Sequence, residues 1–79
     1  MSNLLEPDQF VDASGLNCPL PLLKAKQALN RMQTNELLKV VATDAGSVRD
    51  FKAFTDLSDH VLLESFTQGD RFIYYIRCG

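Results

Sequence analysis

One of the two thiols in this chain stands in an unusual setting, the stretch Gly15-Leu16-Asn17-Cys18-Pro19-Leu20-Pro21. Proline fits the first turn of a helix, because its fixed φ is already helical and its missing N–H would have no partner there. With Pro19 as the first helical residue, Cys18 is expected at the N-cap, beside the positive end of the helix dipole. Thiols in that position have a lowered pKa and a larger thiolate fraction. The stretch therefore predicts a nucleophilic cysteine.

The second proline limits how strongly this thiol is held. An N-cap side chain normally accepts a hydrogen bond from the second or third N–H of the helix, and Pro21 has no N–H to donate. The Leu20 N–H is then the expected donor, so activation of the thiol is expected to be moderate. Moderate activation suits a thiol that passes sulfur on, because nucleophilicity falls together with pKa. Leu20 and Leu23 fall outside the core stripe of the helix, and we expect both to be exposed beside the thiol, where a partner can dock.

Length and charge restrict the class of protein. The 79 residues, 46% of them hydrophobic and 23% charged, predict a flexible N-terminus over residues 1–8 and one globular domain over residues 9–79. A net charge of −2 with acids and bases mixed along the chain argues against direct nucleic-acid binding. No apolar run is long enough for a membrane span, and no signal-peptide pattern opens the chain, so the expected location is the cytoplasm.

Metal-binding residues are sparse. Cys18, Cys78 and His60 are far apart in the sequence and form no pair with the spacing of a zinc site. We therefore expect no metal and no other cofactor, and two reduced thiols. Cys78 alternates with the inward residues of the last strand, so it is interpreted as a packed thiol at the sheet edge opposite Cys18, roughly 20 Å away.

The hydrophobic pattern predicts six elements in the order βαβαββ. Strands are expected at residues 9–14, 37–43, 61–67 and 71–78, with a tight turn at 68–70. Helical crossovers imply parallel pairing of the first three strands, with only the last strand running back. The fold class is then an α/β (α+β) two-layer sandwich, a four-stranded mixed sheet with both helices on one face. The turns at Cys18, at residues 44–47 and at 68–70 should gather at one sheet edge.

Two amphipathic helices fill the intervals between the strands. The first helix should open at Pro19 and end near Thr34-Asn35, and the second should open with a capping-box-like pair, Ser47 and Asp50. The apolar stripes that face the sheet are predicted at Leu22, Ala25, Leu29 and Met32 in the first helix, and at Val48, Phe51, Phe54 and Leu57 in the second.

Charged residues near these elements are candidates for contacts with a partner or an anion. Lys24 and Arg31 share the expected solvent face of the first helix and are candidates for meeting an acidic surface, although a solvated face explains them as well. Arg49 opens the second helix at the Cys18 edge and is a candidate for stabilising an anionic form of the Cys18 sulfur, or for contact with a partner. Asp50 is interpreted as a capping residue, and Asp44 as a turn residue that is also a candidate for partner or anion contact.

The pattern Asp12-Ala13-x-Gly15-Leu16-x-Cys18-Pro19-x-Pro21 resembles the TusA-like sulfur carriers, the SirA/YedF/YeeD family, whose hallmark is Cys-Pro-x-Pro opening the first helix. The Asp44 turn, the Arg49-Asp50 pair and the ending near Arg77 and Gly79 are further matches. The resemblance implies a carrier that takes sulfane sulfur as a persulfide on Cys18 from a cysteine desulfurase or rhodanese-like donor. It implies a protein co-substrate of a sulfurtransferase relay that hands the sulfur to an acceptor, such as the 2-thiouridine pathway of tRNA.

The acceptor stays open at this point. In the family, the branch dedicated to tRNA thiolation typically has glutamate between the two prolines, where this chain has Leu20. Another sulfur acceptor, or a redox or selenium-related role, fits as well. An alternative of a different class is a regulatory or protein-interaction module in which Cys18 is only a structural N-cap. RNA binding by a sandwich of this shape is a third alternative, and it is disfavoured by the negative net charge and by the absence of a basic stripe.

Overall fold

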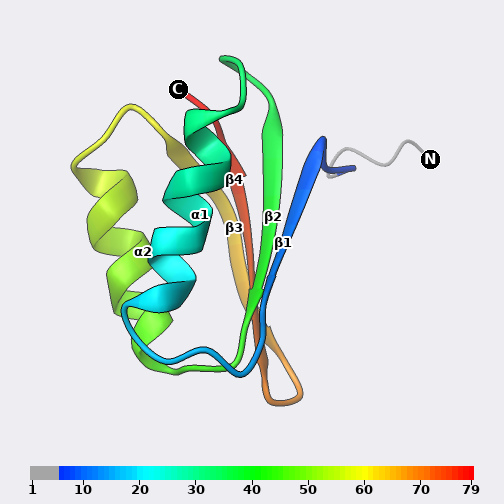
Figure 1. The fold of residues 1–79 in the computed structure, drawn as a ribbon, viewed down its shortest axis with the longest axis vertical. Helices are drawn as coiled ribbons and strands as arrows, with labels where there is room; N and C mark the ends of the chain where they lie inside the picture. Colours follow the sequence, from blue (N-terminus) through cyan, green and yellow to red (C-terminus); the bar gives the residue numbers. More distant parts are fainter. Residues whose placement is uncertain (1–5) are drawn as a thin grey trace.

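A computed structural model describes residues 6–79 as a four-stranded sheet with two helices on one of its faces (Figure 1). The elements are β1 (Gln9–Ala13), α1 (Leu20–Asn30), β2 (Leu37–Ala42), α2 (Gly46–Asp56), β3 (Val61–Gln68) and β4 (Arg71–Arg77). The predicted βαβαββ order and the two-layer architecture are confirmed. The first helix ends at Asn30, earlier than predicted, and a short turn then leads to Asn35, which has a left-handed φ of 77°.

The strand order in the sheet is β1-β2-β4-β3. β1 pairs in parallel with β2, and β4 runs antiparallel to both β2 and β3. Three strands therefore run one way and β4 runs back, as predicted, but the expected pairing of β2 with β3 is wrong because β4 lies between them. The residues of the two strands explain this order. β4 (RFIYYIR) supplies Ile73, Tyr74 and Ile76, which are buried at the centre of the sheet, whereas β3 (VLLESFTQ) is more polar in its second half, is largely exposed and suits an edge.

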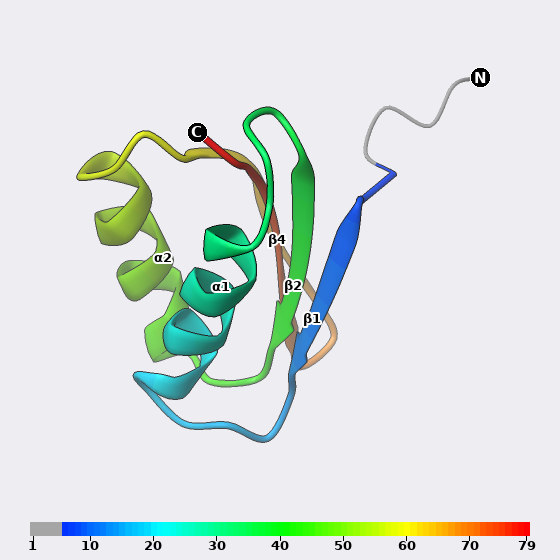
Figure 2. The same cartoon turned by 45° about the horizontal axis from the view of Figure 1, so that its top comes forward.

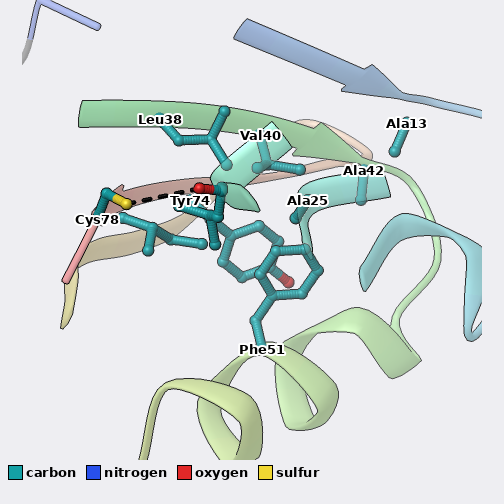
Figure 3. Close-up of a cluster of buried hydrophobic side chains, with 10 residues drawn as sticks. Ala13, Ala25, Leu38, Val40, Ala42, Phe51, Tyr74 and Cys78 are labelled. Atoms are coloured by element: carbon teal, nitrogen blue, oxygen red, sulfur yellow. Dashed lines mark hydrogen bonds between the residues drawn. The ribbon is translucent and has the colours of Figure 1, made fainter. Parts of the chain in front are cut away.

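The core lies between the sheet and the helices (Figure 3). From α1, Ala25 and Leu29 are buried, so the predicted stripe of the first helix is confirmed at its centre. From α2, the Phe51 ring stacks on the Tyr74 ring of β4, with centroids 4.3 Å apart and planes 6° from parallel. The sheet side of the core is completed by Leu38, Val40, Ala42 and Ile76.

The inward face of α2 differs from the prediction. Its buried residues are Ser47, Phe51 and Thr55, whereas Val48 and Leu57 are 45% and 88% exposed. Two polar residues can face the core because each hydroxyl has a partner: Ser47 Oγ pairs with the Tyr74 hydroxyl at 2.7 Å, and Thr55 Oγ1 donates to the Phe51 carbonyl at 2.9 Å. A search for apolar periodicity does not find such positions.

The three turns that were expected to gather do so. The turns that lead into α1 and α2 and the turn between β3 and β4 lie at the same end of the sheet (Figures 1 and 2). Cys78 follows β4 at the opposite end, is only 3% exposed, and donates from Sγ to the Leu29 carbonyl at 3.6 Å. Both cysteines are free thiols within residues 6–79.

The N-terminal segment is described only in part. Residues 1–5 of the segment expected to be flexible lie outside the described residues. Asp8 is tied to the start of β2, since its N–H donates to the Leu37 carbonyl at 2.8 Å and its carboxylate accepts the Leu37 N–H at 2.7 Å. Of the helices in residues 6–79, none combines the length and the apolar character that a membrane span needs.

Candidate functional site

Cys18 lies in the turn between β1 and α1, two residues before the helix begins at Leu20. The N-cap is Pro19, and the peptide bond between Cys18 and Pro19 is cis. The Leu20 N–H donates to the Asn17 carbonyl at 2.8 Å and is not available to the sulfur. The predicted N-cap position of Cys18 is therefore wrong by one residue, because this turn takes the N–H that was expected to hold the thiol. No side chain within residues 6–79 caps α1, so a purely structural N-cap cysteine has no support in the geometry.

The Cys18 thiol instead contacts α2. Its Sγ donates a hydrogen bond to Asp50 Oδ2 at 2.9 Å. The Asp50 side chain is 21% exposed, and its other oxygen lies 4.0 Å from Arg49 Nε. The prediction that Asp50 caps α2 is wrong, because the helix begins at Gly46 with Ala45 as its N-cap, which leaves Asp50 inside the helix.

The charges around Cys18 raise the pKa of its thiol above the ordinary value. The largest cause is the hydrogen bond to the Asp50 carboxylate, which is followed by desolvation and by the negative charges of Asp50 and Asp44. The positive charge of Arg49 acts in the opposite direction and is the smallest of these effects. The expected lowering of the thiol pKa by the helix dipole therefore has the wrong sign, because a full charge at hydrogen-bonding distance outweighs partial charges at helix ends.

The backbone of α2 limits the space beside the thiol. A methyl group on Gly46 would stand 3.6 Å from Cβ and 3.9 Å from Sγ of Cys18, and 2.9 Å from Asp44 Oδ2. That Asp44 oxygen is buried and has no hydrogen-bond partner among residues 6–79. The Asp44 carbonyl accepts the Ser47 N–H at 3.0 Å, so the residue does take part in the turn, as predicted. Its carboxylate, however, belongs to the surroundings of the thiol.

Apolar side chains are exposed at the same end of the molecule. Leu20 and Leu23 are 46% and 44% exposed, which confirms their predicted exposure, whereas Pro21 is buried. Val48, in the first turn of α2, adds a third exposed apolar residue that the sequence had assigned to the core. These three side chains, Leu20, Leu23 and Val48, are here called the apolar rim.

The basic candidates on α1 lie on another surface. Lys24 and Arg31 line a shallow groove between α1 and the edge strand β1, together with Phe10 and Gln27. Arg31 comes directly after α1, roughly 16 Å from the helix start at 1.5 Å per residue. The structure therefore does not bring Arg31 to Cys18, and contact of Lys24 or Arg31 with a partner stays a prediction.

Comparison with known proteins identifies the family. Residues 9–78 match the model of the family described as sulfurtransferase TusA. The chain belongs to the TusA family. It is 51% identical over 70 residues to the sulfur carrier protein TusA of Allochromatium vinosum, which covers 89% of this chain and 92% of that protein. It is 45% identical over 69 residues to a putative sulfur carrier protein of Neisseria meningitidis, with 87% and 93% covered. It is 36% identical over 75 residues to the putative sulfur carrier protein YrkI of Bacillus subtilis, with 95% and 100% covered.

The family match confirms the resemblance inferred from the sequence. The match to TusA includes both the turn with Cys18 and the start of α2, so the whole site lies inside the matched residues. Sequence reasoning identified Cys18 but missed Gly46 and the role of Asp50. The sequence did place the Arg49-Asp50 pair near the start of a helix at the Cys18 edge, which could have indicated a contact with the thiol. Asp50 was interpreted as a capping residue instead.

Proposed function

We propose that this member of the TusA family carries sulfur as a persulfide on Cys18 between a donor protein and an acceptor protein. The observation that carries the proposal is an exposed free thiol, located where both helices begin, in a chain of this family. Relatives that bear the name sulfur carrier protein support it. A cytoplasmic setting belongs to the proposal, because reduced thiols persist there.

Loading exchanges a proton for a sulfur atom. The proposed donor, a cysteine desulfurase or a rhodanese-like protein, presents a cysteine persulfide anion, R–S–S⁻. The Cys18 sulfur attacks the terminal sulfur, the S–S bond of the donor breaks, and the Cys18 proton passes to the remaining donor sulfur. The products are Cys18–S–S⁻ and R–SH, so there is no net oxidation. Unloading is the same exchange with an acceptor thiol.

The apolar rim supports docking of the two partners. Leu20, Leu23 and Val48 are each close to half exposed, and burying them against another protein removes apolar surface from water. Exposed apolar side chains at the end of the molecule that carries the reactive thiol favour a protein partner over a small substrate. The chain then acts as a co-substrate for enzymes that supply the remaining chemistry.

The test is transfer of sulfur in vitro. After incubation with a cysteine desulfurase and cysteine, wild type and Cys78→Ser should gain the mass of one sulfur atom, and Cys18→Ser should gain none. Cys78 is the matched control because it is the second thiol and is buried at the other end of the sheet. Labelling that follows Cys78, or an unlabelled Cys18 in wild type, contradicts the proposal.

The acceptor is proposed to be the tRNA 2-thiouridine pathway, and Leu20 provides a separate test. In cells that lack their own carrier, this chain should restore 2-thiouridine, and Leu20→Glu should restore it at least as well. If both variants load sulfur in vitro and neither restores the modification, the acceptor belongs to another sulfur pathway and the carrier chemistry stands.

A further inference from the structure

The charged groups that act on Cys18 are mainly negative. Within residues 6–79 they are Asp50 and Asp44, which are acidic, and Arg49, which is basic. Asp50 reaches the thiol from α2 at 2.9 Å, and Asp44 comes from the turn that precedes the same helix, with one carboxylate oxygen buried. Arg49 is 84% exposed and lies 4.0 Å from the far oxygen of Asp50, so water screens its charge. The sulfur therefore lies on the acidic side of this arrangement.

The empty and loaded forms of Cys18 interact with Asp50 in opposite ways. The thiol has a proton to donate, and a hydrogen bond to a charged acceptor is stronger than one between neutral groups. A persulfide is more acidic than a thiol and is an anion at neutral pH, so it has no proton to donate to the carboxylate. Loading thus replaces a hydrogen bond by repulsion between two negative charges that are held close together.

This change of sign affects the equilibrium of sulfur exchange. We propose that the Asp50 carboxylate drives Cys18 toward unloading, by stabilising the empty thiol and repelling the loaded persulfide anion. The inference rests on the proposed function. In the exchange Cys18–SH + R–S–S⁻ → Cys18–S–S⁻ + R–SH, one negative charge moves onto the carrier with the sulfur and one proton leaves it. Both transfers are opposed by Asp50, and both are reversed when an acceptor takes the sulfur.

A consequence is that the empty carrier protects its own thiol. The hydrogen bond keeps Cys18 protonated, and a protonated thiol reacts slowly with small electrophiles and oxidants. A donor that offers a positive group to Asp50 would weaken this hold while it is docked. Among residues 6–79, the exposed Arg49 already lies 4.0 Å from the far oxygen of Asp50.

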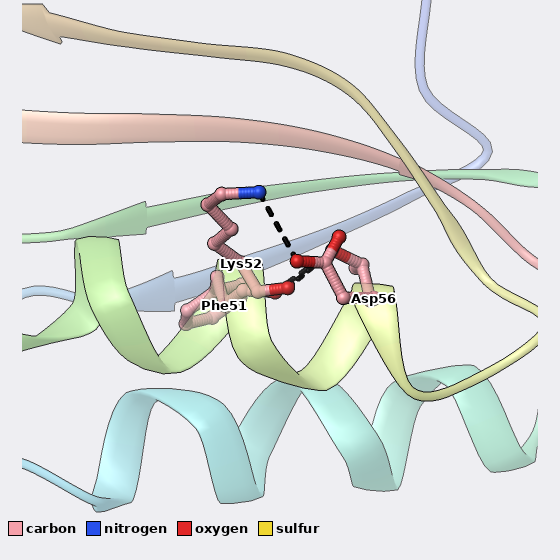
Figure 4. A network of polar contacts seen from close by, with 4 residues as sticks. Phe51, Lys52 and Asp56 are labelled. Atoms are coloured by element: carbon pink, nitrogen blue, oxygen red, sulfur yellow. Dashed lines mark hydrogen bonds and ion pairs between the residues drawn. The ribbon is translucent and has the colours of Figure 1, made fainter.

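The test compares carboxamide variants that keep side-chain size. Asp50→Asn removes the charge next to the thiol, and Asp44→Asn removes a charge that makes no hydrogen bond to it. Asp56→Asn is the matched control, since Asp56 lies at the far end of α2 and pairs with Lys52 at 3.1 Å (Figure 4). Each protein is equilibrated with a fixed ratio of glutathione persulfide to glutathione, and the loaded fraction is measured by intact mass. Cys18→Ser corrects for sulfur bound elsewhere.

Asp50→Asn should raise the loaded-to-empty ratio several-fold over wild type, Asp44→Asn should raise it less, and Asp56→Asn should leave it unchanged. The pH dependence of Cys18 alkylation provides a second readout that needs no persulfide. If the charge of Asp50 holds the proton on the thiol, the Cys18 pKa should be lower in Asp50→Asn than in wild type. A wild type that loads while Asp50→Asn and Asp56→Asn give the same ratio overturns this inference alone. If neither wild type nor Asp50→Asn loads, the proposed function is overturned, and with it the bias of exchange. If Asp50→Asn loads and wild type does not, the bias is supported.

Discussion

Replacing Ser47 by alanine removes one partner of the buried hydrogen bond that joins α2 to β4. Ser47 and Tyr74 are each 1% exposed, and their hydroxyl oxygens are 2.7 Å apart. The substitution leaves the Tyr74 hydroxyl buried without its partner, which costs about 1–3 kcal/mol. Alanine recovers roughly 0.5 kcal/mol through its higher helix propensity. The net loss of unfolding free energy should therefore be about 0.5–2.5 kcal/mol. In a domain of this size, each kcal/mol lost lowers Tm by roughly 4–8 °C.

The complementary change is Tyr74→Phe, which keeps the ring that stacks on Phe51 at 4.3 Å and removes only the hydroxyl. It leaves the Ser47 hydroxyl without its partner and should cost a similar amount. The double variant removes both polar groups together, and a buried pair replaced by apolar groups is close to neutral. The double variant should therefore lose clearly less stability than the sum of the two single losses.

Urea unfolding of the four proteins, followed by circular dichroism, measures this double-mutant cycle. The expected coupling between the two sites is about 1–2 kcal/mol, with unchanged m-values. If the single losses add within about 0.5 kcal/mol, the two hydroxyls do not stabilise each other and the account of α2 attachment given above is wrong.

Three further predictions concern reactivity, the core and the surface. The folded-state pKa of Cys18 is raised, so its contribution to stability is present below the ordinary thiol pKa and is lost as pH rises through the raised value. The midpoint of Cys18 alkylation against pH should therefore be higher in the native protein than in the unfolded chain. Leu29→Ala, at a side chain 2% exposed, should cost about 2–5 kcal/mol in urea unfolding. Lys52→Ala should change the unfolding free energy by less than about 0.5 kcal/mol, since the Lys52 and Asp56 side chains are 72% and 61% exposed. A larger loss in urea unfolding would contradict the view that this exposed ion pair contributes little to stability.

The architecture could be predicted from the sequence because it follows from the periodic spacing of apolar residues. Strands, helices, the mixed sheet and the common edge of the three turns follow from the spacing of apolar residues and from the rules of chain connection. The same reasoning failed for the position of β4, since either strand of the terminal hairpin can pair with β2, and apolar spacing does not say which one does. It also failed at Val48 and Leu57, because Ser47 and Thr55 are buried with hydrogen-bond partners that lie elsewhere in the fold or one turn away.

The chemistry of the thiol was predicted less well than its location. The Cys18 stretch indicates a helix start, and a helix start alone implies a lowered thiol pKa. The carboxylate that reverses this direction is 32 residues further along the chain and reaches Cys18 only after α2 has packed on the sheet. A local motif can place a nucleophile, but the sign of its pKa shift depends on a tertiary contact.

The position of that carboxylate depends in turn on how α2 is attached. Ser47 and Phe51 both contact Tyr74, one through a hydrogen bond and the other through its ring, and Asp50 lies between them in the sequence. Two contacts to one residue of a central strand fix the rotation of the helix about its axis. Since a turn of α-helix spans 3.6 residues, Asp50 then lies at the flank of the buried face of α2, from where its carboxylate reaches Cys18 in the turn before α1. The contacts of Tyr74 with Ser47 and Phe51 thus help to hold the helix that carries Asp50 to the thiol.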